Sequence, residues 1–204
     1  MIHSVYEWIT ANITEVTGTV LGLIYIVFSI RQNILTWPVG LLSSVFYILI
    51  FFSSQLYAAM GLQVYYAFIS IYGWYYWKKS QKEEVSNQIA FVKQTPNSLW
   101  LRILVAEIAL FVLLFFLLKN LTDSDVPVLD ALTTSTSIIA TWMLARKLLE
   151  NWIVWIFTDF ICIFLYFQKG LWPTTILFAV YTIMAFVGYF EWRKNLNIQI
   201  EKNT

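Results

Sequence analysis

The chain has 204 residues, of which 59% are hydrophobic and 12% are charged, and its formal net charge is +1. A soluble domain is nearer half apolar and a quarter charged, so this composition indicates a membrane protein with several spans. The small net charge excludes an electrostatic footprint for nucleic acid. One histidine and one cysteine give no basis for a catalytic or metal site built on those residues, so we expect no enzyme activity, metal or cofactor.

Seven apolar segments are each long enough to cross the hydrocarbon core as a helix, which takes about 20 residues. They cover residues 14–31, 37–54, 57–77, 98–118, 128–147, 151–168 and 172–192. The fifth segment is rich in Ser and Thr, and its hydroxyls are expected to turn inward or to bond preceding carbonyls. The sequence therefore predicts an all-α membrane protein with seven transmembrane helices.

Basic residues gather at alternate ends of these segments. If the N-terminus lies outside, the cytoplasmic ends collect Arg31, Lys78, Lys79, Lys82, Lys93, Arg102, Arg146, Lys147, Arg193, Lys194 and Lys202. Only Lys119 and Lys169 then fall outside. The positive-inside rule therefore predicts an outer N-terminus and a cytoplasmic C-terminus, in the inner (plasma) membrane.

Two sets of landmarks recur along the chain. An Asn-x-x-x-Trp pattern occurs at Asn33–Trp37 and again at Asn151–Trp155, an offset of 118 residues. A second series recurs at an offset of 115, at Tyr66, Gly73 and Trp77 and then at Tyr181, Gly188 and Trp192. The difference predicts that three residues are missing from a turn between the two blocks. We expect repeat one at about 12–78, a linker helix at about 98–118 and repeat two at about 128–194, a 3+1+3 arrangement of parallel repeats.

The sixth segment, which begins NWIVWIFTD, carries indoles and polar groups along one side. Trp152, Trp155 and Asp159 are three or four residues apart and share a helix face, with Asn151 at the edge of the same stripe. A flat cation stacks well on a Trp face, and an acid inside the membrane points to function. Trp152 fits an interfacial aromatic belt equally well. Asp159 fits either a counter-charge for a ligand or a bond to a neighbouring helix.

The matched part of repeat one supplies further candidates. Asn33 and Trp37 are expected to line the other wall of a substrate site. Gln63 and Tyr66 are candidate sugar contacts, with ordinary helix packing as the alternative. Glu107, in the fourth segment, has no evident partner in the sequence.

The segments NILTWPVG, YGWYYW, WIVWIFTD and VGYFEW, with their three-one-three layout, resemble the PnuC family of vitamin transporters over about residues 10–195. The resemblance implies a SWEET-like fold, one transporter domain over residues 1–204, and a homotrimer. It implies facilitated diffusion of nicotinamide riboside, with uptake drawn inward when a cytoplasmic kinase phosphorylates the vitamin. Thiamine, whose thiazolium ring is also a flat cation, is the alternative substrate.

Overall fold

The computed structural model describes residues 13–53, 57–87, 92–122 and 125–203, and the named elements within these ranges are all α-helices. They are α2 (Ile13–Ile30), α3 (Thr36–Ser53), α4 (Tyr57–Asn87), α5 (Asn97–Leu121), α6 (Pro127–Ala145), α7 (Asn151–Gln168) and α8 (Trp172–Asn203). Each helix begins within one residue of the apolar segment expected from the sequence. The prediction of an all-helical protein is confirmed.

Two helices extend well beyond the expected spans. α4 continues to Asn87 and α8 to Asn203, whereas the apolar segments end at about residues 77 and 192. The added turns begin with the basic pairs Lys78–Lys79 and Arg193–Lys194 and are polar after that. Helix propensity is independent of hydropathy, so these helices run on where their apolar spans end.

All four prolines of the chain lie at helix starts. Pro127 is the first residue of α6, Pro173 is the second of α8, Pro38 is the third of α3, and Pro96 immediately precedes α5. The first turn of a helix tolerates proline because its amides have no partner within the helix. The interiors of the spans therefore keep uninterrupted backbone hydrogen bonds, as lipid requires.

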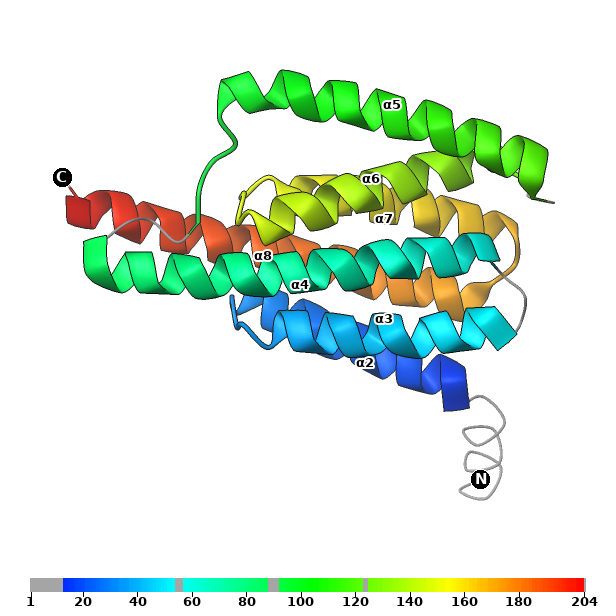
Figure 1. The fold of residues 1–204 in the computed structure, drawn as a ribbon, viewed down its shortest axis with the longest axis horizontal. Helices are drawn as coiled ribbons and strands as arrows, with labels where there is room; N and C mark the ends of the chain where they lie inside the picture. Colours follow the sequence, from blue (N-terminus) through cyan, green and yellow to red (C-terminus); the bar gives the residue numbers. More distant parts are fainter. Residues whose placement is uncertain (1–12, 54–56, 88–91, 123–124, 204) are drawn as a thin grey trace. The chain divides into compact units, whose positions relative to one another are not determined.

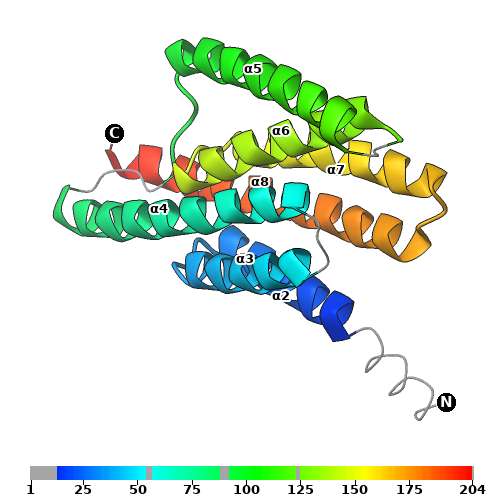
Figure 2. The same ribbon diagram turned by 45° about the vertical axis from the view of Figure 1, so that its right-hand side comes forward.

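The chain falls into two compact units, residues 1–71 and residues 72–204, and α4 runs through the boundary. In the second unit α6 packs against α5 and α7, and α7 packs against α8 (Figure 1). Figure 2 shows α5 at the edge of this unit, on the outer side of α6. In the first unit α2 packs against α3, and Gly40 of α3 lies close to Ser70 of α4.

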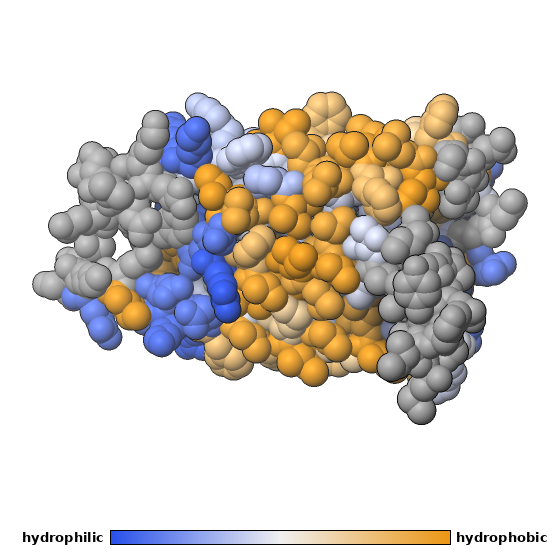
Figure 3. Space-filling model, turned by 90° about the horizontal axis from the view of Figure 1, so that it is seen from below, coloured by the Kyte–Doolittle hydropathy of each residue, from blue (hydrophilic) through white to orange (hydrophobic). Residues whose placement is uncertain are grey.

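The surface matches a lipid environment. In the described part of the chain, four helices are long and apolar enough to span a membrane, namely α5, α6, α7 and Trp172–Ile198 of α8. α5 exposes many large apolar side chains, among them Leu101, Leu104, Val105, Ile108, Leu113 and Phe116. Figure 3 shows hydrophobic residues across the middle of one face and hydrophilic residues at one end of it. A soluble monomer rarely exposes such a surface, so the chain is a multi-pass membrane protein.

The hydroxyls of α6 bond to carbonyls one turn earlier, as expected for a Ser- and Thr-rich span. Thr133, Ser137 and Thr141 donate to the carbonyls of Leu129, Thr133 and Ser137 at 2.9, 2.7 and 2.7 Å. Each polar group is thus satisfied within its own helix, which lets this segment enter lipid in spite of its composition.

The turn from α2 to α3 has the same hydrogen bonds as the turn from α6 to α7. The amides of residues 31–33 bond to the carbonyls of Val27, Ser29 and Phe28 at 3.1, 3.1 and 2.9 Å. The amides of residues 146–148 bond to the carbonyls of Trp142, Leu144 and Met143 at 3.1, 3.0 and 3.0 Å. The second residue of each turn has a positive φ, 53° at Gln32 and 57° at Lys147. Both helices therefore end in the same left-handed cap.

Most ends of the corresponding helices keep the same spacing. α6 ends 115 residues after α2 (145 − 30), α7 begins and ends 115 residues after α3, and α8 begins 115 residues after α4. Asn33–Trp37 and Asn151–Trp155 are 118 residues apart, so these two patterns do not fall at the same place in their helices. At the offset of 115, Trp37 corresponds to Trp152 and Ser44 corresponds to Asp159.

Candidate functional site

α7 turns one side toward the interior of its unit. The buried residues of this helix are Asn151, Trp152, Thr158, Asp159, Cys162 and Leu165, and Trp155 between them is half-buried. Their spacing of three or four residues places them along one stripe. The opposite side exposes Ile153, Phe157, Phe160 and Phe164. The polar and aromatic stripe expected from the sequence is thus the inner side of the helix.

Trp152 is packed inside the protein. Its side chain is 2% exposed, and a Cβ placed on Gly188 would come within 2.7 Å of its ring. The indole of Trp192 meets it edge-on, with centroids 5.5 Å apart. The Nε1 of Trp152 has no hydrogen-bond partner among the described residues. Its burial between α7 and α8 does not fit the interfacial belt that the sequence left open.

Asn151 begins α7 and is fully buried. Its Nδ2 donates to the carbonyl of Leu148 at 2.6 Å, which fixes the amide against the turn before the helix. The Oδ1 is buried without a partner in the described part of the chain. A buried carbonyl oxygen that lacks a donor costs free energy, about 1–3 kcal/mol, so Asn151 is well placed to accept a bond from a bound molecule.

Asp159 is 3% exposed and lies in the middle of an apolar helix. The bond to the Ser- and Thr-rich helix is made by its neighbour, because Thr158 donates to Thr136 of α6 at 2.9 Å. Asp159 itself has no hydrogen bond or ion pair with any described residue. A buried carboxylate in this state lacks the counter-charge that would normally stabilise it.

Asn33 lies in a different setting from Asn151. It is exposed, and its Oδ1 accepts the amide of Leu35 at 2.9 Å, which caps the start of α3. Its own carbonyl accepts the hydroxyl of Thr36 at 2.8 Å. Thr36 is buried and is the first residue of α3, as Asn151 is the first residue of α7. The two asparagines are not equivalent.

The remaining candidates of repeat one are placed as follows. Trp37 is fully buried, like its equivalent Trp152. Gln63 and Tyr66 are half-buried on α4. The carbonyl of Tyr66 accepts the hydroxyl of Ser70 at 2.7 Å, and the Tyr66 ring lies 5.6 Å from that of Tyr65.

A cluster of indoles, which was not predicted from the sequence, lies in the second unit near the α6–α7 turn. Trp77 and Trp192, which are 115 residues apart in the sequence, are both fully buried. Their ring centroids are 6.3 Å apart. Trp77 donates from its Nε1 to the carbonyl of Ala145 at 3.2 Å. The Nζ of Lys147 lies 3.9 Å from the centre of the Trp77 ring, so the buried cation rests on an aromatic face.

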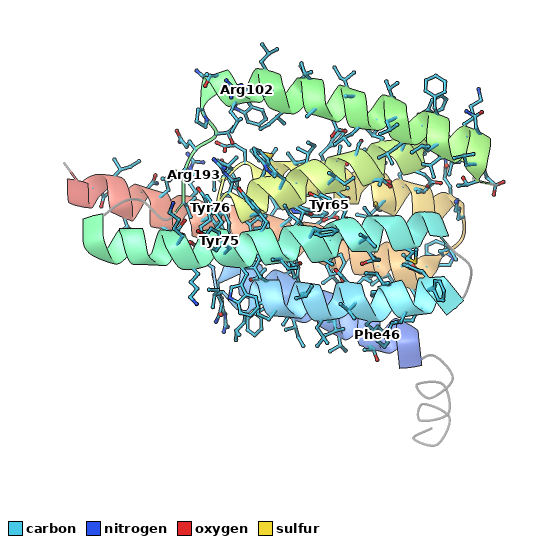
Figure 4. The ribbon with its side chains drawn as sticks, viewed as in Figure 1. Phe46, Tyr65, Tyr75, Tyr76, Arg102 and Arg193 are labelled. Atoms are coloured by element: carbon cyan, nitrogen blue, oxygen red, sulfur yellow. The ribbon has the colours of Figure 1, made fainter. Side chains whose placement is uncertain are left out.

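Arg146, the preceding residue, is exposed and held by aromatic side chains. Its guanidinium donates to the hydroxyl of Tyr72 at 3.2 Å and lies 5.1 Å from the ring centre of Tyr76 and 5.8 Å from that of Trp142. Figure 4 shows Tyr76 on the stretch of α4 that runs beside α8. The hydrogen bond to Tyr72 raises the pKa of Arg146 above its ordinary value, so this cation is permanent.

A short extended segment, residues 92–95, covers the α6–α7 turn. Lys93 bonds through its backbone to the carbonyl of Lys147 at 3.0 Å and to the amide of Leu149 at 2.9 Å. The amide and hydroxyl of Thr95 donate to Glu150 Oε2 at 2.8 and 2.6 Å. This strap attaches the start of α5 to the start of α7. The strap was not predicted from the sequence, because neither its composition nor its length differs from those of an ordinary loop.

Glu107 finds its partner on the next helix. Its Oε1 accepts the hydroxyl of Ser135 at 2.6 Å, which joins α5 to α6 inside the span. The other carboxylate oxygen is buried without a partner in the described residues. Within those residues, no group of three His, Cys, Asp or Glu side chains is close enough to hold a metal ion.

Comparison with protein families gives one clear match. A family model described as nicotinamide mononucleotide transporter matches residues 12–194. The nicotinamide riboside transporter PnuC of Escherichia coli (strain K12) is 26% identical over 200 residues, covering 87% of this chain and 84% of that protein. The PnuC of Neisseria mucosa is 26% identical over 202 residues, with 92% and 73% covered.

Another relative and one solved structure complete the comparison. The riboflavin/roseoflavin transporter RibM of Streptomyces davaonensis is 24% identical over 181 residues, covering 88% of this chain and 84% of that protein. The crystal structure of the vitamin B3 transporter PnuC superposes with a TM-score of 0.74 at 21% identity, covering 97% of this chain and 87% of that one. The two chains therefore share a fold.

Proposed function

Because this chain belongs to the nicotinamide mononucleotide transporter family, we propose that it is a membrane carrier for nicotinamide riboside. Similar proteins named as nicotinamide riboside transporters support the substrate class. The geometry of α7 supports the choice of ligand. Its buried carboxylate, Asp159, has no counter-charge among the described residues, and this is the observation that carries the proposal.

Nicotinamide riboside brings the group that Asp159 lacks. Its pyridinium ring is flat and carries a fixed positive charge. Trp155, one helical turn before Asp159, offers an aromatic face for that ring, and a desolvated contact of this kind is worth about 2 kcal/mol. The unpaired Oδ1 of Asn151 would accept a hydrogen bond from the carboxamide or the ribose.

The other expected contacts divide into three groups. Gln63 and Tyr66 remain proposed contacts to the ribose hydroxyls. Trp37 and Trp152 are both buried, and we assign Trp152 the task of fixing the orientation of α7 against α8. We do not propose Asn33 as a substrate contact, because its side-chain Oδ1 already accepts the amide of Leu35 at the start of α3.

Thiamine is the second candidate substrate. Its thiazolium ring is also a flat cation, so Asp159 and Trp155 suit it equally. Riboflavin, named for the relative RibM, has an uncharged ring system and would leave Asp159 buried without a counter-charge. The carboxylate thus favours a cationic vitamin over a neutral one.

The mode of transport is facilitated diffusion. The sequence contains no G-x-x-x-x-G-K-[ST] motif for nucleotide hydrolysis. Net uptake would follow from phosphorylation of the vitamin by a cytoplasmic kinase, which removes the free substrate. A carrier of this kind alternates between at least two states, each open to one side of the membrane.

The arrangement in the membrane is part of the same proposal. Equal helix ends and equal turn hydrogen bonds at an offset of 115 residues support two parallel three-helix repeats joined by α5, within one transporter domain. Such a 3+1+3 layout is SWEET-like. The distribution of basic residues supports an outer N-terminus and a cytoplasmic C-terminus in the plasma membrane. The apolar outer surface of α5 is a suitable interface for a homotrimer.

Uptake into proteoliposomes tests the function. Purified protein reconstituted without any ion gradient is expected to admit radiolabelled nicotinamide riboside or thiamine in a saturable manner, down to equal concentrations on both sides. Protein-free liposomes are the control. A strict requirement for a proton or sodium gradient would contradict facilitated diffusion, and failure to admit either vitamin would contradict the proposed substrate class.

A further inference from the structure

The strap of residues 92–95 pairs with the α6–α7 turn on both sides of one residue, Leu148. The amide of Lys93 donates to the carbonyl of Lys147 at 3.0 Å, and the carbonyl of Lys93 accepts the amide of Leu149 at 2.9 Å. Lys147 has a left-handed backbone with a φ of 57°, which costs free energy in a residue that carries a side chain. The two bonds to the strap therefore stabilise this turn in an uncommon shape.

Leu148 in turn fixes the position of Asn151. The carbonyl of Leu148 accepts the backbone amide of Asn151 at 3.2 Å and the side-chain Nδ2 of the same residue at 2.6 Å. Because Nδ2 is bonded there, the oxygen at the other end of the amide group, Oδ1, points away from Leu148. Oδ1 is buried without a partner among the described residues. The turn thus presents one buried acceptor in a fixed direction.

The strap is also bonded to the residue that precedes Asn151. Glu150 Oε2 accepts the amide of Thr95 at 2.8 Å and the hydroxyl of Thr95 at 2.6 Å. Thr95 is buried, and hydrogen bonds to a carboxylate are stronger than bonds between neutral groups. Val92, at the other end of the strap, is fully buried. Asn151 is therefore connected to the strap through Leu148 and through Glu150, and all of these residues belong to the second unit.

We propose that Thr95 and Glu150 are positioning residues for the substrate, which hold the α6–α7 turn so that Oδ1 of Asn151 accepts a hydrogen bond from the carboxamide of nicotinamide riboside. A buried acceptor in a fixed direction favours a ligand with a donor at that point. It disfavours a ligand without one, because the oxygen then stays unpaired. The strap contributes to substrate selection in this way without touching the ligand itself. The inference rests on the proposed function, because it assigns Asn151 to one group of that ligand.

Binding of two matched ligands tests this role. Full-length protein in lipid nanodiscs is titrated with nicotinamide riboside and with pyridinium riboside, which has the same ring charge and sugar but no carboxamide. Thr95→Val has nearly the same shape but no hydroxyl. It is expected to weaken binding of nicotinamide riboside about fivefold and to change binding of pyridinium riboside less than about twofold. Thr95→Ser keeps the hydroxyl and should restore the affinity to within about twofold of the unchanged protein.

Thr175→Val is the matched control. Thr175 is another buried threonine of the second unit, and its hydroxyl bonds to the carbonyl of Leu171 at 2.9 Å. It lies in the first turn of α8, next to the end of α7 rather than its start, so its loss should leave both affinities unchanged. The midpoint of thermal unfolding is recorded for every variant. Equal weakening of both ligands by Thr95→Val would show that the strap only stabilises the fold, and would overturn the inference.

A double-mutant cycle tests the connection through Asn151. Asn151→Ala removes Oδ1 and is expected to weaken binding of nicotinamide riboside about tenfold. In that background Thr95→Val should cause no further loss, because the acceptor that the strap positions is gone. Additive effects of the two substitutions would contradict a shared role. If Asn151→Ala does not fold, the comparison of the two ligands with Thr95→Val still decides the question.

The outcomes separate this inference from the proposed function. If Thr95→Val binds nicotinamide riboside as well as the unchanged protein does, the strap has no positioning role and the proposed function stands. If the unchanged protein binds nicotinamide riboside no better than pyridinium riboside, Asn151 does not receive the carboxamide and only the inference falls. If the unchanged protein binds neither riboside, both proposals fall.

Discussion

α3 and α7 share bounds, turn geometry and register, yet only α7 carries the chemistry proposed for the site. Where α7 has Trp155 and Asp159, α3 has Gly40 and Ser44. Ser44 satisfies its hydroxyl on the carbonyl of Gly40 at 2.8 Å, whereas Asp159 has no partner among the described residues. Two helices with the same spacing and similar preceding turns can therefore differ in charge, as the proposed asymmetric ligand would require.

The turns that precede these two helices differ in the same way. Gln32 and Asn33 are half-buried and exposed, respectively, whereas Lys147 and Leu148 are buried, the latter two beside the strap of residues 92–95. The hydrogen bonds within the two turns are nevertheless the same. The second turn is thus fixed by contacts from outside itself, which holds the start of α7 in place.

The largest expected effect comes from the acid that distinguishes α7 from α3. Asp159→Asn should weaken binding of a cationic vitamin by about 3 kcal/mol, on the order of 100-fold, because a buried counter-charge is lost. Titration calorimetry measures this, and a neutral analogue should be nearly unaffected. Ser44→Ala, at the equivalent position, is the control and should change little. Equal losses for cationic and neutral ligands would show that Asp159 has a structural role.

The second-largest effect is expected at Trp155, where α3 has Gly40. Trp155→Ala should cost about 2 kcal/mol of binding free energy, roughly 30-fold in affinity, through loss of an aromatic face for the cation. Fluorescence or calorimetric titration gives the affinity. Trp100→Ala on α5, which removes a 40% exposed indole, should leave binding unchanged. Unchanged affinity in Trp155→Ala would show that this indole does not contact the ligand.

The packing of Trp152 against α8 can be tested through Gly188. Gly188→Ala places a methyl group 2.7 Å from the Trp152 ring, so the ring or α8 must move, and we expect a loss of about 1–3 kcal/mol in stability. Thermal unfolding in detergent measures the change. Gly61→Ala, where a Cβ meets nothing within 4 Å, should be neutral or slightly stabilising in its helix. An unchanged midpoint in Gly188→Ala would contradict the close packing of α7 on α8.

The smallest effect is expected at the strap. Glu150→Gln weakens the two bonds that Oε2 accepts from Thr95, and the loss should be about 1 kcal/mol in stability. Hydrogen exchange at the amides of Lys93 and Leu149 should rise with it, because both are bonded across the same junction. Glu191→Gln, an exposed carboxylate of α8, is the control. Unchanged protection at both amides would show that Glu150 does not hold the strap.

The sequence predicted the helices well because hydropathy and proline placement determine where spans begin. It placed the ends of α4 and α8 too early, since a polar helix beyond the membrane has no apolar signal. The Asn-x-x-x-Trp pattern is loose and recurs at an offset of 118 residues, whereas most helix ends and the hydrogen bonds of the two turns correspond at 115.

For the stripe on α7, the sequence predicted which side of the helix is buried but not which contacts its residues make. Helical periodicity placed Trp152 and Asp159 correctly on one side of the helix. It did not predict that Thr158 would take the bond to α6, or that Trp152 would be enclosed by Gly188 and Trp192. Those outcomes depend on how α6 and α8 approach α7.

Titration calorimetry of the unchanged protein with nicotinamide riboside, thiamine and riboflavin tests the central claim most directly, namely that the inner side of α7 selects a flat cationic vitamin. We predict saturable binding of at least one of the two cations and much weaker binding of riboflavin. Tight binding of riboflavin with no response to either cation would contradict the account.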